Sequence, residues 1–173
     1  MSSGWVCPEC GLDYDTVSPR DAAAAVRSFP RRYRELLDDF DDGEGDAAIR
    51  KRPDATTWSA LEYTAHVADI LEAFGPVLRR MTEEDHPSID FFDSDERAAE
   101  RRYNEADPNT VLADIEAASR ALADVIDGVD SSAWERTATF SWGDRDALTT
   151  ARNAVHEGSH HLRDVKRVLE SVA

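Results

Sequence analysis

The chain is short of lysine, of cysteine and of long apolar runs, and each shortage excludes a class of protein. Lys51 and Lys166 are the only lysines, and the formal net charge is −16. So acidic a surface repels the phosphates of nucleic acids and of anionic lipids, and we expect neither nucleic acid nor a membrane as a partner. No apolar stretch approaches the roughly 20 residues that a membrane-spanning helix needs.

The first ten residues, MSSGWVCPEC, lack the basic stretch followed by an apolar stretch that marks a secretory signal. We therefore expect a cytoplasmic protein. The two cysteines, Cys7 and Cys10, enclose only two residues, and a reducing cytosol would keep them as thiols. A disulfide framework is excluded.

Apolar residues are plentiful enough for a buried core. They make up 41% of the 173 residues, which excludes a disordered chain and suits one globular domain. We expect residues 1–17 to form a short irregular segment that contains the cysteines, and residues 18–173 to form the domain.

The first half of that domain predicts two helices. Pro19 suits the first turn of a helix after Ser18 that runs through Phe40, with Pro30 as a candidate kink. Residues 41–57, rich in Asp and Gly, predict a loop. The second helix starts near Trp58, where Ser59 and Glu62 have the spacing of a capping box. Its apolar stripe has steps of three and four residues and consists of Tyr63, Val67, Ile70, Phe74 and Val77.

The second half predicts two more helices. Residues 83–103 suit a long crossover with a short helix. Asp107 and Pro108 suit the start of a third helix and Gly128 its end. A loop with an extended segment at 137–141 precedes a fourth helix over 146–172. The pattern predicts an all-α four-helix bundle, in which the crossover allows an order other than up-down-up-down.

Five histidines, three of them within six residues, are the most informative feature. Side chains four residues apart share one face of a helix. The fourth helix therefore offers two candidate metal clamps: His156 with His160, and Glu157 with His161. Imidazole nitrogen and carboxylate oxygen both bind first-row divalent metals.

The apolar stripe of the fourth helix favours the second pair. At about 100° per residue, His161 lies roughly a quarter turn from the stripe and Glu157 somewhat further. His160 lies almost opposite the stripe and is expected to face water. His156 is no further from the stripe than Glu157, so it remains an alternative ligand.

His66, at the edge of the second helix's stripe, is the expected third ligand. Three protein ligands leave an open coordination position of the catalytic type. Asp69 and Asp164 each follow a proposed ligand histidine by three residues and could orient its ring. The structural alternatives are a satisfied core histidine at His66, a surface histidine at His160 and a loop histidine at His86.

Two segments resemble a known family. Residues 58–69, WSALEYTAHVAD, resemble the segment around the first metal ligand of the DinB-like superfamily of four-helix bundles. Residues 157–165, EGSHHLRDV, resemble that superfamily's last helix. An acidic loop, a third helix, Trp134 and Gly143 lie between them in the same order as in the family, and the similarity spans residues 18–170.

The resemblance implies a divalent metal, zinc or nickel above all, held by His66, Glu157 and His161. Many members of the superfamily use three histidines, whereas the mycothiol-dependent maleylpyruvate isomerases resemble this chain in using His, Glu and His. The resemblance further implies a thiol-dependent S-transferase or isomerase that takes a low-molecular-weight thiol and an electrophile.

Several alternatives stay open. The chain could be a non-catalytic metal-binding module of the stress response, and it could form a homodimer. The Cys7–Cys10 pair resembles half of a zinc ribbon, but the chain has no further cysteine. The pair could be inert, could share zinc with a histidine such as His86 or with a second subunit, or could be a redox dithiol.

Overall fold

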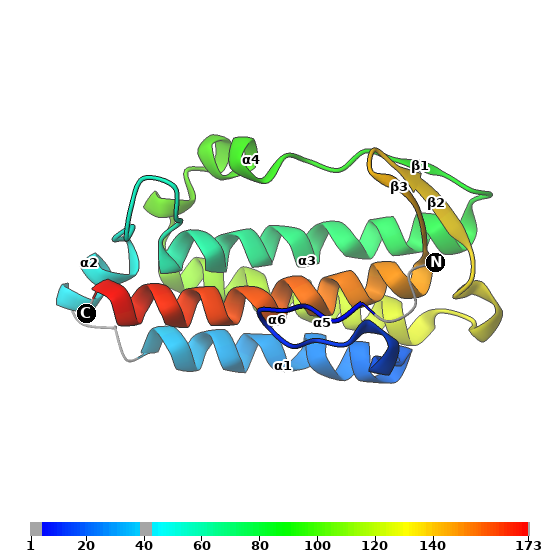
Figure 1. The fold of residues 1–173 in the computed structure, drawn as a ribbon, viewed down its shortest axis with the longest axis horizontal. Coiled ribbons are helices and arrows are strands. Elements are labelled where there is room, and N and C mark those ends of the chain that lie inside the picture. The colour runs from blue at the N-terminus through cyan, green and yellow to red at the C-terminus, as the bar shows by residue number, and fades with distance from the viewer. Residues whose placement is uncertain (1–4, 39–42, 173) are drawn as a thin grey trace.

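The computed structural model describes residues 5–38 and 43–172. Four long helices lie side by side and form a four-helix bundle, as predicted (Figure 1). They are α1 (Pro19–Asp38), α3 (Ala60–Glu83), α5 (Pro108–Gly128) and α6 (Ala147–Val172). α3 packs against α5 and α6, and α1 packs against the same two helices.

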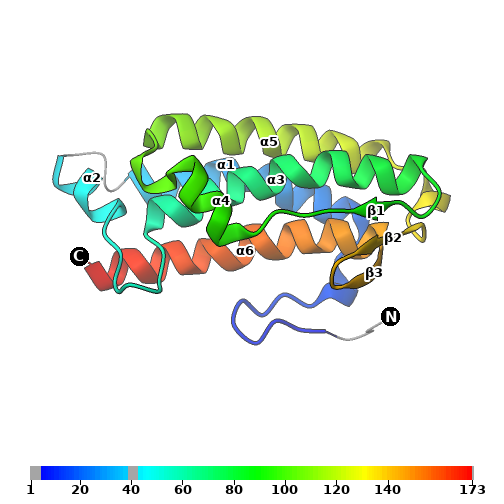
Figure 2. The same ribbon diagram turned by 90° about the horizontal axis from the view of Figure 1, so that it is seen from above.

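The helices do not alternate in direction. The colour order in Figure 1 and in the view from above (Figure 2) shows α3 and α5 running one way, and α1 and α6 the other. The connection between the parallel pair α3 and α5 must therefore return along the length of the bundle. This crossover, residues 84–107, covers one side of α3.

The crossover and the loop before α6 form a small sheet together. The crossover carries β1 (Ser88–Ile89), α4 (Ser94–Arg101) and the 3-10 turn η2 (Tyr103–Glu105). β1 pairs in parallel with β2 (Thr137–Phe140), which pairs antiparallel with β3 (Gly143–Asp146). The extended segment predicted at 137–141 is β2. The sequence does not predict the pairing of β2 with β1, because the two residues of β1 are too few to form a recognisable strand pattern.

Polar caps determine where the helices begin. Ser59 Oγ accepts from the Glu62 amide at 3.1 Å, and the Glu62 carboxylate accepts from the Ser59 amide at 2.8 Å, which completes the predicted capping box. Asp107 accepts from the amide of Thr110 at 2.8 Å. These contacts fix the starts of α3 and α5 close to the predicted positions.

One expectation about residues 41–57 is wrong. Residues 43–49, expected as part of a loop, form α2 (Gly43–Ile49), because Ile49 is buried in the core and anchors the segment. α1 continues through Pro30, so this proline does not divide the helix, and the rings of Phe29 and Tyr33 on either side of it are fully buried. The predicted end of the first helix at Phe40 lies outside the described residues.

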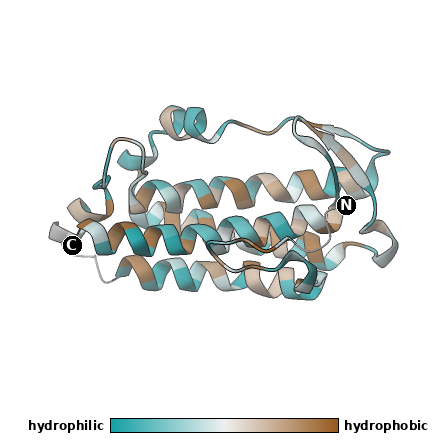
Figure 3. Cartoon of the chain, viewed as in Figure 1, coloured by the Kyte–Doolittle hydropathy of each residue, from teal (hydrophilic) through white to brown (hydrophobic). Residues whose placement is uncertain are grey.

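The long helices are amphipathic. Figure 3 shows hydrophobic and hydrophilic residues interspersed along each of them, whereas the loops are mostly hydrophilic. The remaining short turns, η1 (Tyr14–Thr16) and η3 (Ser131–Ala133), lie at the ends of connections. None of the described helices is long and apolar enough to cross a membrane.

Gly158, in the middle of α6, allows α1 to approach closely. A methyl group at this position would overlap the ring of Phe29, which is fully buried on α1. The hydroxyl of Tyr33, one turn further along α1, donates to the carbonyl of Gly158 at 2.9 Å. Because cores are packed near crystal density, the ring cannot move without disturbing its neighbours.

We expect Gly158→Ala to destabilise the protein by about 1–3 kcal/mol, the usual cost of overpacking a core. Urea unfolding followed by circular dichroism measures this free energy. Gly75→Ala is the matched control: Gly75 lies in the middle of α3, and a methyl group there meets nothing within 4 Å. The control should be neutral or stabilising by up to about 1 kcal/mol, and equal losses in both variants would contradict the close approach at Gly158.

Candidate metal centre

The packing of α3 on α6 brings the three predicted ligands together. His66 comes from α3, and Glu157 and His161 come from successive turns of α6. One donor atom from each side chain lies within 4.8 Å of the others. His66 is only 3% exposed, so the cluster lies between the helices rather than on the outer surface.

The separations of the donor atoms suit ligands of one ion better than hydrogen-bonded partners. Glu157 Oε2 lies 3.3 Å from His161 Nε2 and 3.6 Å from His66 Nε2. An N–H···O hydrogen bond is usually 2.7–3.2 Å long. Ligands at zinc distances in a tetrahedral shell lie about 3.4 Å apart. The ring nitrogen His66 Nδ1 is buried and has no hydrogen-bond partner among the described residues.

Asp164 orients the ring of His161, as predicted. Its Oδ2 lies 2.8 Å from His161 Nδ1, which leaves Nε2 directed at Glu157. Burial alone would lower the pKa of His161, but the hydrogen bond with Asp164 and the negative charges of Asp164 and Glu157 raise that pKa to about 9. Burial alone would raise the pKa of Glu157, yet His161 and His66 lower it well below the ordinary value.

Asp69 does not orient His66, contrary to expectation. Its carboxylate accepts from Tyr103 at 2.6 Å, from Arg97 at 2.9 Å and from Arg101 at 2.7 Å. Both oxygens of the Asp69 carboxylate therefore bind residues of the crossover and hold it against α3. The sequence could not reveal this, because the partners are 28 to 34 positions away.

Aromatic rings support the two histidines. The ring of Trp58 stands edge-on to His66, with centroids 5.1 Å apart, and Tyr63 stacks on His161 at 5.2 Å. Both rings thus pack directly against a predicted ligand. They shield the cluster on the side of α3.

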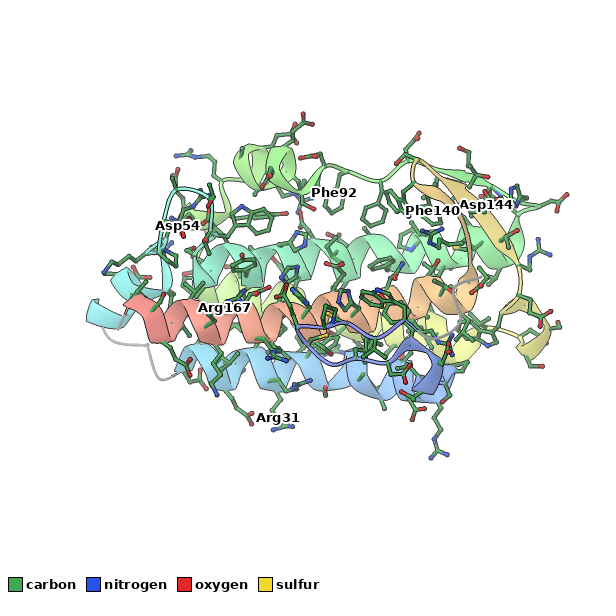
Figure 4. All side chains as sticks on the ribbon, viewed as in Figure 1. Arg31, Asp54, Phe92, Phe140, Asp144 and Arg167 are labelled. Atoms are coloured by element: carbon green, nitrogen blue, oxygen red, sulfur yellow. The ribbon has the colours of Figure 1, made fainter. Side chains whose placement is uncertain are left out.

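A pocket of about 330 Å³ reaches the cluster from the crossover side. Glu157 belongs to its wall, and so does Arg145. The rest of the wall is largely aromatic and includes Phe74, Phe91, Phe92, Phe140 and Trp142. Figure 4 shows Phe92 and Phe140 on the side of α3 that the crossover covers. A larger cavity of about 540 Å³ lies between α3 and α5, but none of the three predicted ligands lines it.

The other histidines lie elsewhere. His86 lies in the loop before β1, as expected, and its ring forms hydrogen bonds with the hydroxyls of Thr137 and Thr139 at 2.8 and 2.9 Å. His160 does not face open water. The N-terminal segment, residues 5–18, lies along the outer side of α6 (Figure 2) and leaves the His160 side chain half-buried. The expectation was wrong because the helical wheel does not show what covers the polar face.

That segment places its cysteines beside His156 and His160. Cys7 Sγ lies 3.6 Å from His160 Nδ1, and both cysteines are free thiols. Burial alone would raise the pKa of Cys7, but the Cys10 amide, which donates to its sulfur, the Glu9 amide and the neighbouring imidazoles of His156 and His160 lower that pKa to about 6.

Comparison with known proteins agrees with this architecture. The model of the DinB superfamily matches residues 25–165. The chain belongs to the DinB superfamily. This confirms the family that the motifs around His66 and His161 indicated. No curated protein sequence matches the chain.

Solved structures support the same fold. YfiT from Bacillus subtilis, described as a probable metal-dependent hydrolase with an unusual four-helix bundle topology, is 12% identical. It superposes with a TM-score of 0.78 over 89% of each chain. Two structures of a mycothiol-dependent maleylpyruvate isomerase, a variant and the unsubstituted protein, are 15% identical with TM-scores of 0.68 and 0.67. This chain covers 62% of the isomerase's length. At these identities the likeness supports the fold alone.

We expect metal affinity at the His66–Glu157–His161 cluster to rise with pH. Below about 9, the pKa of His161, an ion must displace the proton on that ring, so affinity should change about tenfold per pH unit. Above that pKa it should level off. Chelator competition in a chain carrying Cys7→Ser and Cys10→Ser measures the effect without thiol ligands.

Asp164→Asn is the matched control for this pH dependence. It removes the charge that helps to raise the pKa of His161, so the pH at which affinity levels off should move down. An affinity that is flat between pH 7 and pH 9 in the parent chain, or an unchanged profile in the variant, would contradict the assignment of that proton to His161.

Proposed function

We propose that the protein is a divalent-metal-dependent enzyme, in which His66, Glu157 and His161 hold a zinc or nickel ion and a low-molecular-weight thiol is the nucleophile. The reaction class is S-transfer or isomerisation. The observation that carries the proposal is that one side chain, Glu157, belongs both to the convergent ligand set and to the wall of the aromatic pocket.

The ligand set is of the open type. Three side chains supply two imidazoles and one carboxylate, and catalytic zinc sites typically have three protein ligands and a free position. Glu157 is 30% exposed at its side chain, whereas His66 is almost fully buried. Access therefore lies on the Glu157 side, where the pocket is.

A divalent ion at such a site lowers the pKa of a bound thiol, which makes the nucleophilic thiolate available at neutral pH. The chain's own residues supply the rest. Asp164 holds the His161 ring in place, and the rings of Trp58 and Tyr63 exclude water from the ligands.

The pocket suits an electrophile with an apolar part and a negative group. Its aromatic wall would bury the apolar part. The Arg145 guanidinium lines the same pocket and forms no ion pair with a described residue, donating instead to the backbone carbonyl of Asp144 at 2.7 Å. It is thus available to a carboxylate.

The thiol part of the proposal extends to this chain the thiol dependence described for the isomerase, which shares the fold. Hydrolysis is the second candidate, because an open position admits water as readily as a thiol and because YfiT is described as a probable metal-dependent hydrolase. Thiol-independent turnover of an ester or amide would favour hydrolysis. A non-catalytic metal-binding module would catalyse neither thiol conjugation nor hydrolysis.

We expect His66→Ala to lower the metal content by one equivalent and to reduce thiol conjugation to background, because two ligands cannot hold the ion firmly. Metal analysis and assays with mycothiol, bacillithiol and glutathione against carboxylate-bearing electrophiles measure both effects. His86→Ala, in the small sheet, is the control and should change neither. A fully metal-loaded protein that conjugates no thiol would refute the thiol reaction.

We expect Trp142→Ala to raise KM severalfold with unchanged metal content. Trp142 sits in the turn between β2 and β3, stacks on Phe140 at 5.1 Å and lines the pocket without touching the ligand set. Its loss should weaken contact with the electrophile and leave the metal ligands in place. An unchanged KM in an active protein would place the substrate elsewhere.

A further inference from the structure

The N-terminal segment brings a second set of metal-binding side chains to α6. Cys7 and Cys10 come from the segment, and His156 and His160 come from the helix. One donor atom from each of the four lies within 4.8 Å of the others. None of them belongs to the His66–Glu157–His161 cluster, and the cysteines precede the residues that match the superfamily.

The cysteines are arranged as a compact turn. The Gly11 amide donates to the Cys7 carbonyl at 2.9 Å, and the Cys10 amide donates to Cys7 Sγ at 3.4 Å. Gly11 adopts a φ of +74°, which a glycine tolerates without strain. The turn directs both sulfur atoms at α6, and an amide donor to sulfur favours the thiolate.

The distances suit a tetrahedral ion. Zinc binds sulfur at about 2.3 Å and imidazole nitrogen at about 2.0–2.1 Å, so two such ligands in a tetrahedral shell lie about 3.6 Å apart. Cys7 Sγ and His160 Nδ1 are 3.6 Å apart. His156 Nε2 is buried without a hydrogen-bond partner among the described residues, a costly state that ligation would remove.

Carboxylates stand behind both histidines. His160 Nε2 lies 3.5 Å from Asp164 and 3.7 Å from Glu9. His156 Nδ1 lies 4.0 Å from Glu157. These separations exceed hydrogen-bond length, so the carboxylates add negative charge near both rings, which favours a cation there.

We propose that Cys7, Cys10, His156 and His160 form a second, structural zinc site that fastens the N-terminal segment to α6. Two thiolates and two imidazoles close the coordination shell, as in structural zinc sites, and two thiolates balance the charge of the ion. Because all four coordination positions are filled by protein, the site has a structural role and leaves no position for a substrate.

One competing ligand set uses His160 differently. Glu9, His160 and Asp164 also have donor atoms within 4.8 Å of one another. Asp164, however, already accepts from His161 at 2.8 Å and from Arg167, and Glu9 is exposed. The set lacks the thiolates that select zinc, so the cysteine set is favoured.

The test is cobalt substitution of the full chain, purified under reducing conditions and stripped of metal. Thiolate ligands give Co²⁺ an intense near-ultraviolet charge-transfer band that histidine and carboxylate ligands do not. We expect this band in the parent chain, with two equivalents bound. Cys10→Ser and His156→Ala should each abolish the band and remove one equivalent, with helical circular dichroism retained.

His66→Ala separates this inference from the proposed function. It should remove one equivalent and leave the thiolate band unchanged. If the His66 site binds no metal, the parent chain will bind one equivalent with the band intact. If Cys7, Cys10, His156 and His160 do not bind one ion, the parent chain will show no thiolate charge-transfer band, or that band will survive in the variant that carries both His156→Ala and His160→Ala.

Thiol protection gives a second measurement that does not depend on cobalt. In the zinc-loaded protein both cysteines should resist alkylation, and a chelator should expose them. Alkylation at full rate in the zinc-loaded protein, or a Cys7–Cys10 disulfide in the freshly purified reduced chain, would overturn the proposal in favour of free thiols or a redox pair.

Discussion

The close packing of α6 against its two neighbours is the contact on which the rest of the structure depends. Gly158 lacks a side chain where the ring of Phe29 presses against α6, while Glu157 and His161 lie on the side of α6 that meets His66 of α3. The donor atoms of these three side chains come within 4.8 Å of one another. A helix held from both sides in this way keeps the candidate ligands in fixed positions, which a metal site would require.

The charged partners of the candidate ligand carboxylate differ from those of the structural carboxylates. Glu62 is bound by Arg52 and Asp69 by Arg101, at 2.5 and 2.7 Å, so these acids are neutralised within the fold. Glu157 is paired with imidazoles alone. An arginine is always charged and would compete with a cation, whereas a histidine can give up its proton and share the ion. The chemistry of the partner thus distinguishes a site from a structural ion pair.

How much the sequence predicts depends on how local the interaction is. The capping box at Ser59 and the i, i+4 pair at Glu157 and His161 are set by neighbouring residues, and both form as predicted. Asp69 was assigned to the nearest histidine, yet it binds residues on the crossover. His160 was placed in water because the helical wheel gives the direction of a side chain and not what lies over it.

The structure gives the two candidate clamps different surfaces to face. His156 with His160 and Glu157 with His161 are the same i, i+4 pattern shifted by one residue, so they point about 100° apart on α6. One pair faces α3 and the other faces the N-terminal segment, whose CPEC sequence supplies soft ligands. Asp164 lies beside a histidine of each pair. A single helix therefore presents two candidate metal-binding groups with one carboxylate near both, so under the two proposals a change at Asp164 would be felt at each.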